Sequence, residues 1–263
     1  MIGFNNLGKL GRLGNQMFQY ASLRGIAANN NLNWMIPPPK KVPNEYVDHQ
    51  LFYAFTLKGL KALNVQFVCG ERETVKENSF AFDEELFNNC PKWVNLEGYF
   101  QSEKYFTHIK DEIKEDFTFG SEYLEPAKEM IRTVDNPVAL HIRRTDYTTN
   151  PNHHALELSY YEEALTHFDK DRTVIIFSDD TEWCNQQSLF DDDRFMIAEN
   201  NINYVDMCLM SLCSGHIIAN SSFSWWGAWL SNSEKVIAPQ KWFGPGNAHL
   251  DTKDLYCPDW IVI

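Results

Sequence analysis

One short stretch of the sequence combines an apolar run with a dense group of ionisable side chains. Residues 138–140 are apolar, a pattern that predicts a buried parallel strand. His141, Arg143, Arg144 and Asp146 follow within a few positions. Ligands of open α/β sheets bind beyond the carboxyl ends of the strands, so we expect the chemistry of this protein at this point of the chain.

The two adjacent arginines indicate a ligand with several anionic oxygens, such as a diphosphate. A guanidinium group offers a rigid fork of donors and stays charged at any working pH. Side chains alternate across a strand, so His141 and Arg143 share one face while Ile142 turns to the other. The alternative is that Arg143 and Arg144 only form surface ion pairs with nearby acids, which contribute little to stability.

Two further polar clusters follow predicted strands of the second half. The strands are expected at residues 138–143, 173–177, 195–198, 216–219 and 236–238, with helical segments between them. This alternation is typical of a parallel, doubly wound sheet. The polar clusters comprise Ser178, Asp179 and Asp180 after the second strand, and Asn220, Ser221, Ser222 and Phe223 after the fourth. We therefore expect three clusters along one edge, where arginines and serines can hold phosphates and a carboxylate can accept from a base.

A glycine-rich turn precedes a predicted helix near the N-terminus. Gly8, Gly11 and Gly14 punctuate this turn, and apolar residues then recur at helical spacing. The turn places backbone N–H groups and the Asn15 amide, next to Gln16, at a helix start that favours anions or sugar oxygens. The alternative is a tight connection, and the spacing matches neither a G-x-G-x-x-G nor a Walker loop.

The length of 263 residues allows one large α/β domain or two smaller ones. Periodicity is weak over residues 40–119, where only residues 93–100 alternate like a strand. A helix predicted over residues 122–133 leads into the arginine-bearing strand. We place the domain boundary in this helix, which gives domains of residues 1–125 and 126–263.

The composition of the chain indicates which classes of protein it can belong to. Hydrophobic residues make up 44% and aromatic residues 14% of the chain, which excludes disorder and suits apolar or sugar-stacking clefts. The net charge of −13 disfavours binding to nucleic acid or to anionic membranes. The N-terminus lacks the pattern of a signal peptide, and no run approaches the roughly 18 apolar residues of a membrane span. Six scattered cysteines without a C-x-x-C pair favour a reducing compartment over a zinc site or a disulfide framework.

Two other groups of residues invite a metal interpretation. Asp179, Asp180 and the acidic run at residues 191–193 resemble the acidic motifs that hold divalent cations in some nucleotide-sugar enzymes. The arginines already supply the positive charge that a metal would give, so we expect none. His153 and His154 are adjacent and cannot form an i, i+4 metal-binding pair, so we expect a surface loop that can still contact a substrate.

With these residues assembled, the sequence resembles the alpha-1,2-fucosyltransferase family. The matching stretches, in the order of the family, are residues 11–21, 141–147, 177–180 and 220–228. The block His141 to Asp146 is shared with protein O-fucosyltransferases and alpha-1,6-fucosyltransferases, whereas the block Ser221 to Ala228 resembles the alpha-1,2 group. Residues 40–119 resemble no family that we can name.

The resemblance implies an α/β fold of the GT-B type, with two Rossmann-like domains facing a cleft. The C-terminal domain would bind GDP-fucose, and the N-terminal domain would lie on the acceptor side. The reaction would be the transfer of L-fucose with inversion to a hydroxyl, expected to be O2 of a galactose, of a glycan acceptor. No metal or cofactor besides the donor substrate is implied.

The resemblance also assigns roles to single residues. Arg143 would hold the β-phosphate, His141 and one of Asp179 and Asp180 would bind guanine, and Asn15 would approach from the opposite domain. Contacts with phosphate and fucose would come from Ser221, Ser222 and Phe223. The remaining donor-site candidates are Gly14, Gln16, Arg144 and Asn220.

Three questions stay open at this stage. The general base can be Asp146, Asp179 or Glu157. The protein can instead use another nucleotide sugar, or be a non-catalytic glycan-binding descendant, although the intact Arg143 and Asn15 argue against the latter. Animal members carry an N-terminal membrane anchor, so we expect a cytoplasmic form of microbial or viral origin, with peripheral membrane association left open.

Overall fold

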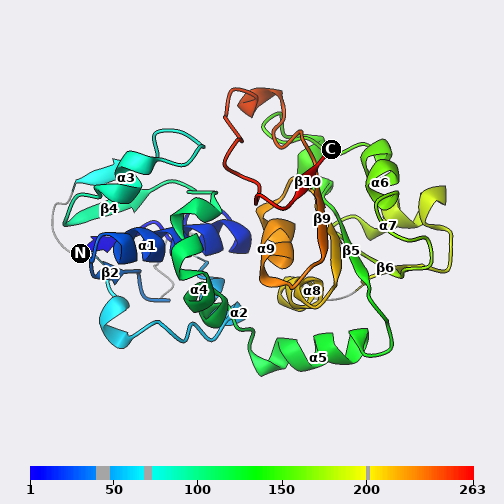
Figure 1. The fold of residues 1–263 in the computed structure, drawn as a ribbon, viewed down its shortest axis with the longest axis horizontal. Helices are drawn as coiled ribbons and strands as arrows, with labels where there is room; N and C mark the ends of the chain where they lie inside the picture. The colour runs from blue at the N-terminus through cyan, green and yellow to red at the C-terminus, as the bar shows by residue number, and fades with distance from the viewer. Residues whose placement is uncertain (40–47, 68–72, 200–201) are drawn as a thin grey trace. The chain divides into compact units, whose positions relative to one another are not determined.

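The computed structural model of this protein describes residues 1–39, 48–67, 73–199 and 202–263, and these form two compact units (Figure 1). Unit 1 comprises Met1–Gly120 and Leu250–Cys257, and unit 2 comprises Ser121–His249 and Pro258–Ile263. The division thus falls at the start of a helix, five residues before the position we chose from the sequence. The C-terminal part of the chain also contributes a segment to unit 1, which the sequence did not indicate.

Unit 1 contains a four-stranded parallel sheet in the order β2-β1-β4-β3. Its strands are β1 (Ile2–Gly3), β2 (Trp34–Met35), β3 (Thr74–Lys76) and β4 (Val94–Glu97). Its helices are α1 (Leu13–Asn29), α2 (Leu51–Ala54), α3 (Glu84–Asn88) and α4 (Lys110–Asp116), with 3-10 turns η1 (Ala62–Asn64), η2 (Glu103–Tyr105) and η3 (Thr107–Ile109).

Helix α1 is the central element of unit 1. It has apolar or small residues on almost every side, and therefore it is buried around most of its circumference. Gly25 allows η2 to approach closely, since a Cβ at this position would lie 1.8 Å from the carbonyl oxygen of Tyr105. Arg24 of α1 pairs with the fully buried Asp116 of α4, which also accepts from the Tyr20 hydroxyl at 3.0 Å.

The C-terminal segment of unit 1 is held by one buried carboxylate. Asp254 accepts hydrogen bonds from the Phe82 backbone N–H at 3.0 Å and from Lys104 Nζ at 2.5 Å. These contacts explain why residues 250–257 belong to unit 1, although in the sequence they lie between the two segments of unit 2.

Unit 2 contains a six-stranded parallel sheet in the order β10-β9-β8-β5-β6-β7. Its strands are β5 (Val138–Ile142), β6 (Val174–Ser178), β7 (Phe195–Ile197), β8 (Gly215–Ile217), β9 (Lys235–Ala238) and β10 (Ile261–Val262). Its helices are α5 (Ser121–Ile131), α6 (Leu158–Leu165), α7 (Thr181–Asn185), α8 (Asn203–Ser211) and α9 (Ser222–Leu230), with 3-10 turns η4 (Thr145–Thr148), η5 (Ser188–Phe190) and η6 (Pro245–Asn247). The five strands expected from the sequence are all present, within about two residues at each end.

Helices cover both faces of this sheet. Helices α8 and α9 lie on one face, and α6 and α7 lie on the other (Figure 1). Strand β5 is therefore buried on both sides, which is why it is an apolar run and not an alternating one. Val138, Leu140 and Ile142 belong to the core that includes α6, whereas His141 faces α9, where it contacts Ser224.

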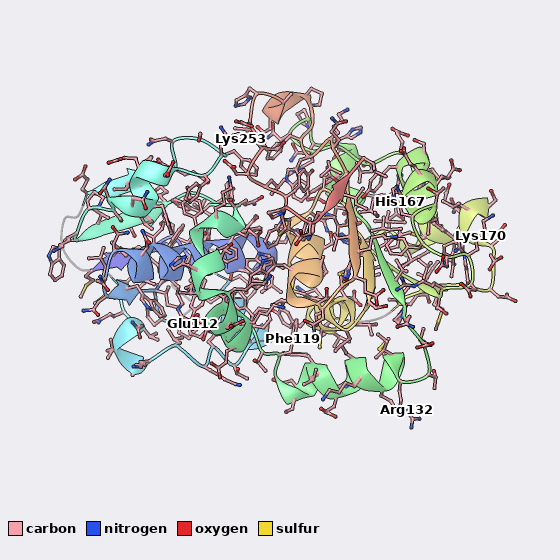
Figure 2. All side chains as sticks on the ribbon, viewed as in Figure 1. Glu112, Phe119, Arg132, His167, Lys170 and Lys253 are labelled. Atoms are coloured by element: carbon pink, nitrogen blue, oxygen red, sulfur yellow. The ribbon has the colours of Figure 1, made fainter. Side chains whose placement is uncertain are left out.

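Side chains fill the space between each sheet and its helices (Figure 2). At the surface, Arg132 follows the end of α5 and pairs with Glu129 at 3.1 Å, with 70% of each side chain exposed. An ion pair so exposed contributes little to stability.

Five of the six cysteines lie in the described residues, and all five are free and buried, whereas Cys69 lies outside them. No helix in the described ranges combines the length and the apolar character needed to cross a membrane.

Candidate functional site

The three polar clusters lie on three neighbouring strands of unit 2. Strand β5 pairs in parallel with β6 on one side and with β8 on the other, so the carboxyl ends of all three strands meet at one edge. Ile142 pairs with Ser178, and Leu140 pairs with Ile217. The residues that follow these pairs are therefore brought together, as the sequence predicted.

Arg143 follows β5 directly and is surrounded by carboxylates and an aromatic ring. Its guanidinium group lies 2.5 Å from Asp146 Oδ1 and 3.1 Å from Asp179 Oδ2. The ring of Tyr147 lies 5.3 Å from the guanidinium carbon. Only 19% of the Arg143 side chain is exposed, whereas half of the Asp146 side chain is in contact with solvent. Asp146 is thus the partner that an incoming anion can replace most easily.

Arg144 is fixed in a different environment. Its Nε lies 3.3 Å from Asp180 Oδ2, and its guanidinium carbon lies 4.0 Å from the Trp183 ring, a cation–π contact. Asp180 caps α7, because its Oδ1 accepts from the Trp183 backbone N–H at 3.1 Å. Arg144 therefore joins the turn after β5 to the start of α7.

Asp179 organises the turn that carries the arginines. Besides its contact with Arg143, its carboxylate accepts from the Arg144 backbone N–H at 2.9 Å and from the Thr145 hydroxyl. A carboxylate has about four acceptor sites, so one site remains after these three contacts. Asp180 accepts from the Trp183 backbone N–H and from Arg144 Nε, which by the same count leaves two sites, so both aspartates considered for guanine keep acceptor capacity.

His141 is buried and neutral. Burial, with the Arg143 guanidinium as a second cause, lowers the pKa of its imidazole to about 3. Its Nδ1 lies 2.8 Å from Ser224 Oγ of α9, and its ring lies 5.7 Å from the Phe223 ring, centroid to centroid. A neutral imidazole donates at one nitrogen and accepts at the other, so the contact with Ser224 fixes the orientation of the ring.

The cluster after β8 lies at the start of α9. Ser221 is the N-cap residue of this helix, and its hydroxyl accepts from the Phe223 backbone N–H at 3.3 Å. Ser222 and Phe223 are half-buried in the first turn. Asn220 is 2% exposed, and its Nδ2 donates to the carbonyl oxygens of His154 at 2.8 Å and Trp242 at 2.9 Å.

The predicted residues of unit 1 lie at the start of α1. Asn15 Oδ1 accepts from Gln101 Nε2 at 2.7 Å. Gly14 and Gln16 are buried, and Gln16 Nε2 donates to the backbone carbonyl of Asp48 at 2.7 Å. Gly11 has a φ of +78°, a conformation that glycine adopts without strain. The turn and the helix are as predicted, whereas the donor contact expected of Gln16 stays a prediction.

The acidic residues outside this site do not form a metal centre in the described part of the chain. Within residues 1–39, 48–67, 73–199 and 202–263, no three His, Cys, Asp or Glu side chains are grouped so as to hold a metal ion. The run at residues 191–193 is exposed, and Asp192 accepts from the Arg194 backbone N–H at 3.0 Å.

Comparison with known families decides the classification. The model of the family "Glycosyl transferase family 11" matches residues 1–263. The chain belongs to glycosyl transferase family 11. The resemblance to alpha-1,2-fucosyltransferases that the sequence blocks indicated is thereby confirmed.

Curated relatives of this family 11 chain include bacterial and animal glycosyltransferases. It is 35% identical over 198 residues to the O-antigen biosynthesis glycosyltransferase WbnK of Escherichia coli, a match that spans 67% of this chain and 64% of that protein, just under two thirds. It is 32% identical to an alpha-1,2-colitosyltransferase of Escherichia coli, over 96% of each chain. It is 25% identical to galactoside alpha-(1,2)-fucosyltransferase 2 of Sus scrofa, over 99% of this chain and 80% of that protein.

Solved structures of fucosyltransferases share the fold of the family 11 chain. FUT1 of Arabidopsis thaliana, in complex with GDP, superposes with a TM-score of 0.59 at 10% identity, over 90% of this chain and 70% of that one. The NodZ alpha-1,6-fucosyltransferase, soaked with GDP-fucose, gives a TM-score of 0.55 at 12% identity, over 95% and 97%. The expected fold class, α/β of the GT-B type, is confirmed.

Sequence reasoning gave no specific role to three side chains at this site of the family 11 protein. Tyr147 and His153 stack with ring centroids 4.2 Å apart and an interplanar angle of 6°. Trp183 carries the Arg144 guanidinium. Tyr147 ends the block of residues 141–147, and Trp183 follows the block of residues 177–180 by three positions, and this closeness was the available signal. The contact of His153 depends on the path of a loop, which no local pattern indicates.

Proposed function

We propose that this family 11 chain is an inverting glycosyltransferase that moves L-fucose from GDP-fucose to O2 of a galactose in a glycan acceptor. The observation that carries the proposal is the position of Arg143, at the edge where the three polar clusters meet, in a chain of this family. The relative from Sus scrofa is named a galactoside alpha-(1,2)-fucosyltransferase, which supports the acceptor and the linkage.

The electrostatics of unit 2 support a diphosphate at Arg143. The guanidinium group is neutralised by Asp146 and Asp179, and Asp146 is half-exposed. A phosphate can take the place of the Asp146 carboxylate on the same fork of donors, because both are anions that bind a guanidinium group in a bidentate manner. The first turn of α9 adds backbone N–H groups, which favour phosphate oxygens at a helix start.

The proposed reaction uses this positive charge when the donor breaks. The acceptor oxygen forms a bond to C1 of fucose while the bond from C1 to the β-phosphate oxygen breaks, and GDP leaves with the electron pair. The diphosphate gains negative charge as the bond breaks, so Arg143 stabilises the transition state more than the ground state. The acceptor hydroxyl passes its proton to a base.

The base remains a choice among Asp146, Asp179 and Glu157. Asp179 is engaged with three donors of the turn after β5, which leaves it little capacity for a proton. If the diphosphate displaces Asp146 from Arg143, the Asp146 carboxylate becomes available at the edge of the site. This order of events favours Asp146 among the three candidates that the sequence left open.

The remaining roles follow the family resemblance. His141 and one of Asp179 and Asp180 would bind guanine, and Ser221, Ser222 and Phe223 would contact phosphate and fucose. Asn15, in unit 1, would take part from the acceptor-side domain, and Gly14 and Gln16 would hold its turn. Neither a metal ion nor a cofactor is part of the proposal, and a cytoplasmic location stays a prediction of the sequence.

A colitose donor is the second candidate, because one relative at 32% identity is named an alpha-1,2-colitosyltransferase. Colitose differs from fucose by the absence of the 3-hydroxyl group. A site that binds this hydroxyl by a hydrogen bond would reject the colitose donor strongly, whereas a site without such a bond would accept both.

A donor screen tests both candidates. Calorimetry with GDP, ADP and UDP should show a preference for GDP of at least tenfold, since an unpaired buried acceptor costs on the order of 1–3 kcal/mol. Turnover with GDP-fucose, GDP-colitose and a galactose-terminated acceptor, followed by mass spectrometry and NMR of the product, identifies the sugar, the linkage and the anomeric configuration. Equal affinity for the three nucleotides, or a retained configuration, would contradict the proposal.

A further inference from the structure

His153 and Tyr147 form a stack beside Arg143. Their ring centroids lie 4.2 Å apart at an interplanar angle of 6°, and the Arg143 guanidinium carbon lies 5.3 Å from the Tyr147 ring. The Tyr147 hydroxyl also donates to the backbone carbonyl of Asn220 at 3.3 Å. Tyr147 is therefore held at its ring face by His153 and at its hydroxyl by the start of the β8 cluster.

The loop that carries His153 is itself fixed by two other segments. Asn220 Nδ2 donates to the carbonyl oxygen of His154. On the other side of the loop, the backbone N–H of Gly244 donates to the Asn152 carbonyl at 3.0 Å, and that of Gly246 donates to the Pro151 carbonyl at 2.9 Å. The residues before and after His153 thus have defined partners, and the position of the ring over Tyr147 is built into unit 2.

Glycine is required at position 244 because a side chain would not fit there, and not because of its backbone conformation. Its φ is −75°, which any residue adopts. A Cβ at Gly244 would lie 2.1 Å from the His153 carbonyl oxygen and 2.5 Å from that of Pro151, so any larger residue must displace the loop. A Cβ at Gly246 would meet chiefly the end of the Asn152 side chain, at 2.3 Å, which can rotate away.

We infer that His153 is a positioning residue, which acts through Tyr147 to hold the Arg143 guanidinium at the edge of the sheet. The inference rests on the proposed function, because it takes a diphosphate as the ligand of Arg143. This role depends on the flat ring of His153 and not on its nitrogen atoms. A stacked ring restricts Tyr147, and a restricted Tyr147 restricts Arg143, so less conformational entropy is lost when the diphosphate binds.

The surroundings of His153 agree with a neutral, stacked ring. The charged groups that face it are Asp146 and Arg143, whose effects on its pKa oppose one another, and burial lowers this pKa below the ordinary value. The atoms of the loop that lie nearest to Gly244 and Gly246 are the carbonyl groups of Pro151 and His153 and the Asn152 side chain, and none of these is charged.

The test compares variants that remove the ring, keep the ring without its nitrogens, or displace the loop. His153→Ala should weaken GDP binding, measured by calorimetry, roughly three- to tenfold, the range expected for loss of an aromatic pair. Gly244→Ala should have the same effect without changing His153 itself. His153→Phe should bind GDP within about twofold of the wild type, because it restores the stack. The matched controls, His154→Ala and Gly246→Ala, should bind GDP as the wild type does.

The outcomes separate this inference from the proposed function. A wild-type protein that binds no GDP contradicts the proposed function, and the inference with it. If the wild type binds GDP and His153→Ala binds it equally well, only the inference is overturned. If His153→Phe is as impaired as His153→Ala, the imidazole nitrogens matter and the positioning role is wrong. Circular dichroism on each variant confirms that unit 2 is folded.

Discussion

At the scale of single residues, Arg143 and Arg144 are neighbours in sequence with different surroundings. Arg143 lies between Asp146 and Asp179, with Tyr147 at its side, and Asp146 is exposed enough to be replaced. Arg144 joins the turn after β5 to the start of α7 through Asp180 and Trp183. We therefore expect Arg143 to be available to a ligand and Arg144 to have mainly a structural role.

Substitution of each arginine by lysine tests this difference. Arg143→Lys keeps the charge but loses the fork of donors, so turnover with GDP-fucose should fall about 10²–10³-fold, with a smaller change in donor KM. Arg144→Lys should keep turnover within about tenfold, and its melting temperature should fall, because the contacts with Asp180 and Trp183 weaken. Steady-state kinetics and melting curves on both variants give the result. Near-normal turnover of Arg143→Lys together with an inactive Arg144→Lys would reverse the assignment.

At the scale of elements, the strands of unit 2 were predictable and their neighbours were not. Short apolar runs predict such strands, and the five runs after residue 137 are strands β5 to β9, of which β7 at the sheet edge is partly exposed. Their order is set by long-range packing, so the adjacency of β8, β5 and β6 had to be assumed from the fold class. Short or polar strands escape this kind of reasoning, as β10 and the exposed β3 show.

The candidate site, too, could be predicted from the sequence only in part. Arg143, Asp179 and Ser221 each follow a strand, and a general rule about parallel sheets brings such residues together. The stack of His153 on Tyr147 depends on hydrogen bonds from Asn220 and Gly244 to a loop. Such contacts join residues 66 or more positions apart, and no local pattern in the sequence records them.

Strand β8 carries a buried histidine that should make stability depend on pH. His216 is 1% exposed, between Met210 and Ser233, and burial lowers its pKa to about 4. The unfolded imidazole has a pKa of about 6.5, so between these values the unfolded state binds more protons. The free energy of unfolding should therefore fall as the pH drops below 6.5, by up to about 1.4 kcal/mol per pH unit for this histidine.

Urea denaturation between pH 7.5 and 5 measures this slope. His141, with a pKa lowered to about 3, adds to it in the same direction over the same interval. His216→Gln removes one titrating group, so its unfolding free energy should depend less steeply on pH, whatever its absolute stability. An unchanged slope in this variant would show that His216 is already protonated, or accessible to protons, in the folded protein.

A substitution in helix α1 shows whether close packing or intrinsic helix propensity decides the stability of this helix. Alanine favours a helix over glycine by about 1 kcal/mol, so Gly25→Ala would stabilise α1 if propensity decided. The added Cβ would lie 1.8 Å from the Tyr105 carbonyl oxygen, a backbone atom that cannot turn away. Overpacking typically costs about 1–3 kcal/mol, so the variant should be destabilised in denaturation. The control is Ala28→Gly at an exposed position of the same helix, which should cost only the propensity difference.

At the scale of the whole molecule, each unit has its own parallel sheet, and the chain returns to unit 1 through residues 250–257. The net charge of the chain is −13, so the overall field repels an anionic donor. The attraction must therefore come from local groups, namely the arginine beside β5 and the helix start after β8. We expect these groups to take the part that a divalent cation has in some nucleotide-sugar enzymes.

This reasoning leads to the prediction that turnover needs no divalent cation. Extensive treatment with EDTA should leave the rate with GDP-fucose within about twofold of the untreated rate, and added magnesium or manganese should not raise it. The physical reason is that a bound cation and Arg143 would stabilise the same charge on the leaving diphosphate, so one makes the other unnecessary. The Arg143→Lys variant is the control, because a cation that carried this role would make the loss of the guanidinium fork nearly harmless. Activity abolished by EDTA and restored by magnesium or manganese would show that the arginine alone does not supply the charge.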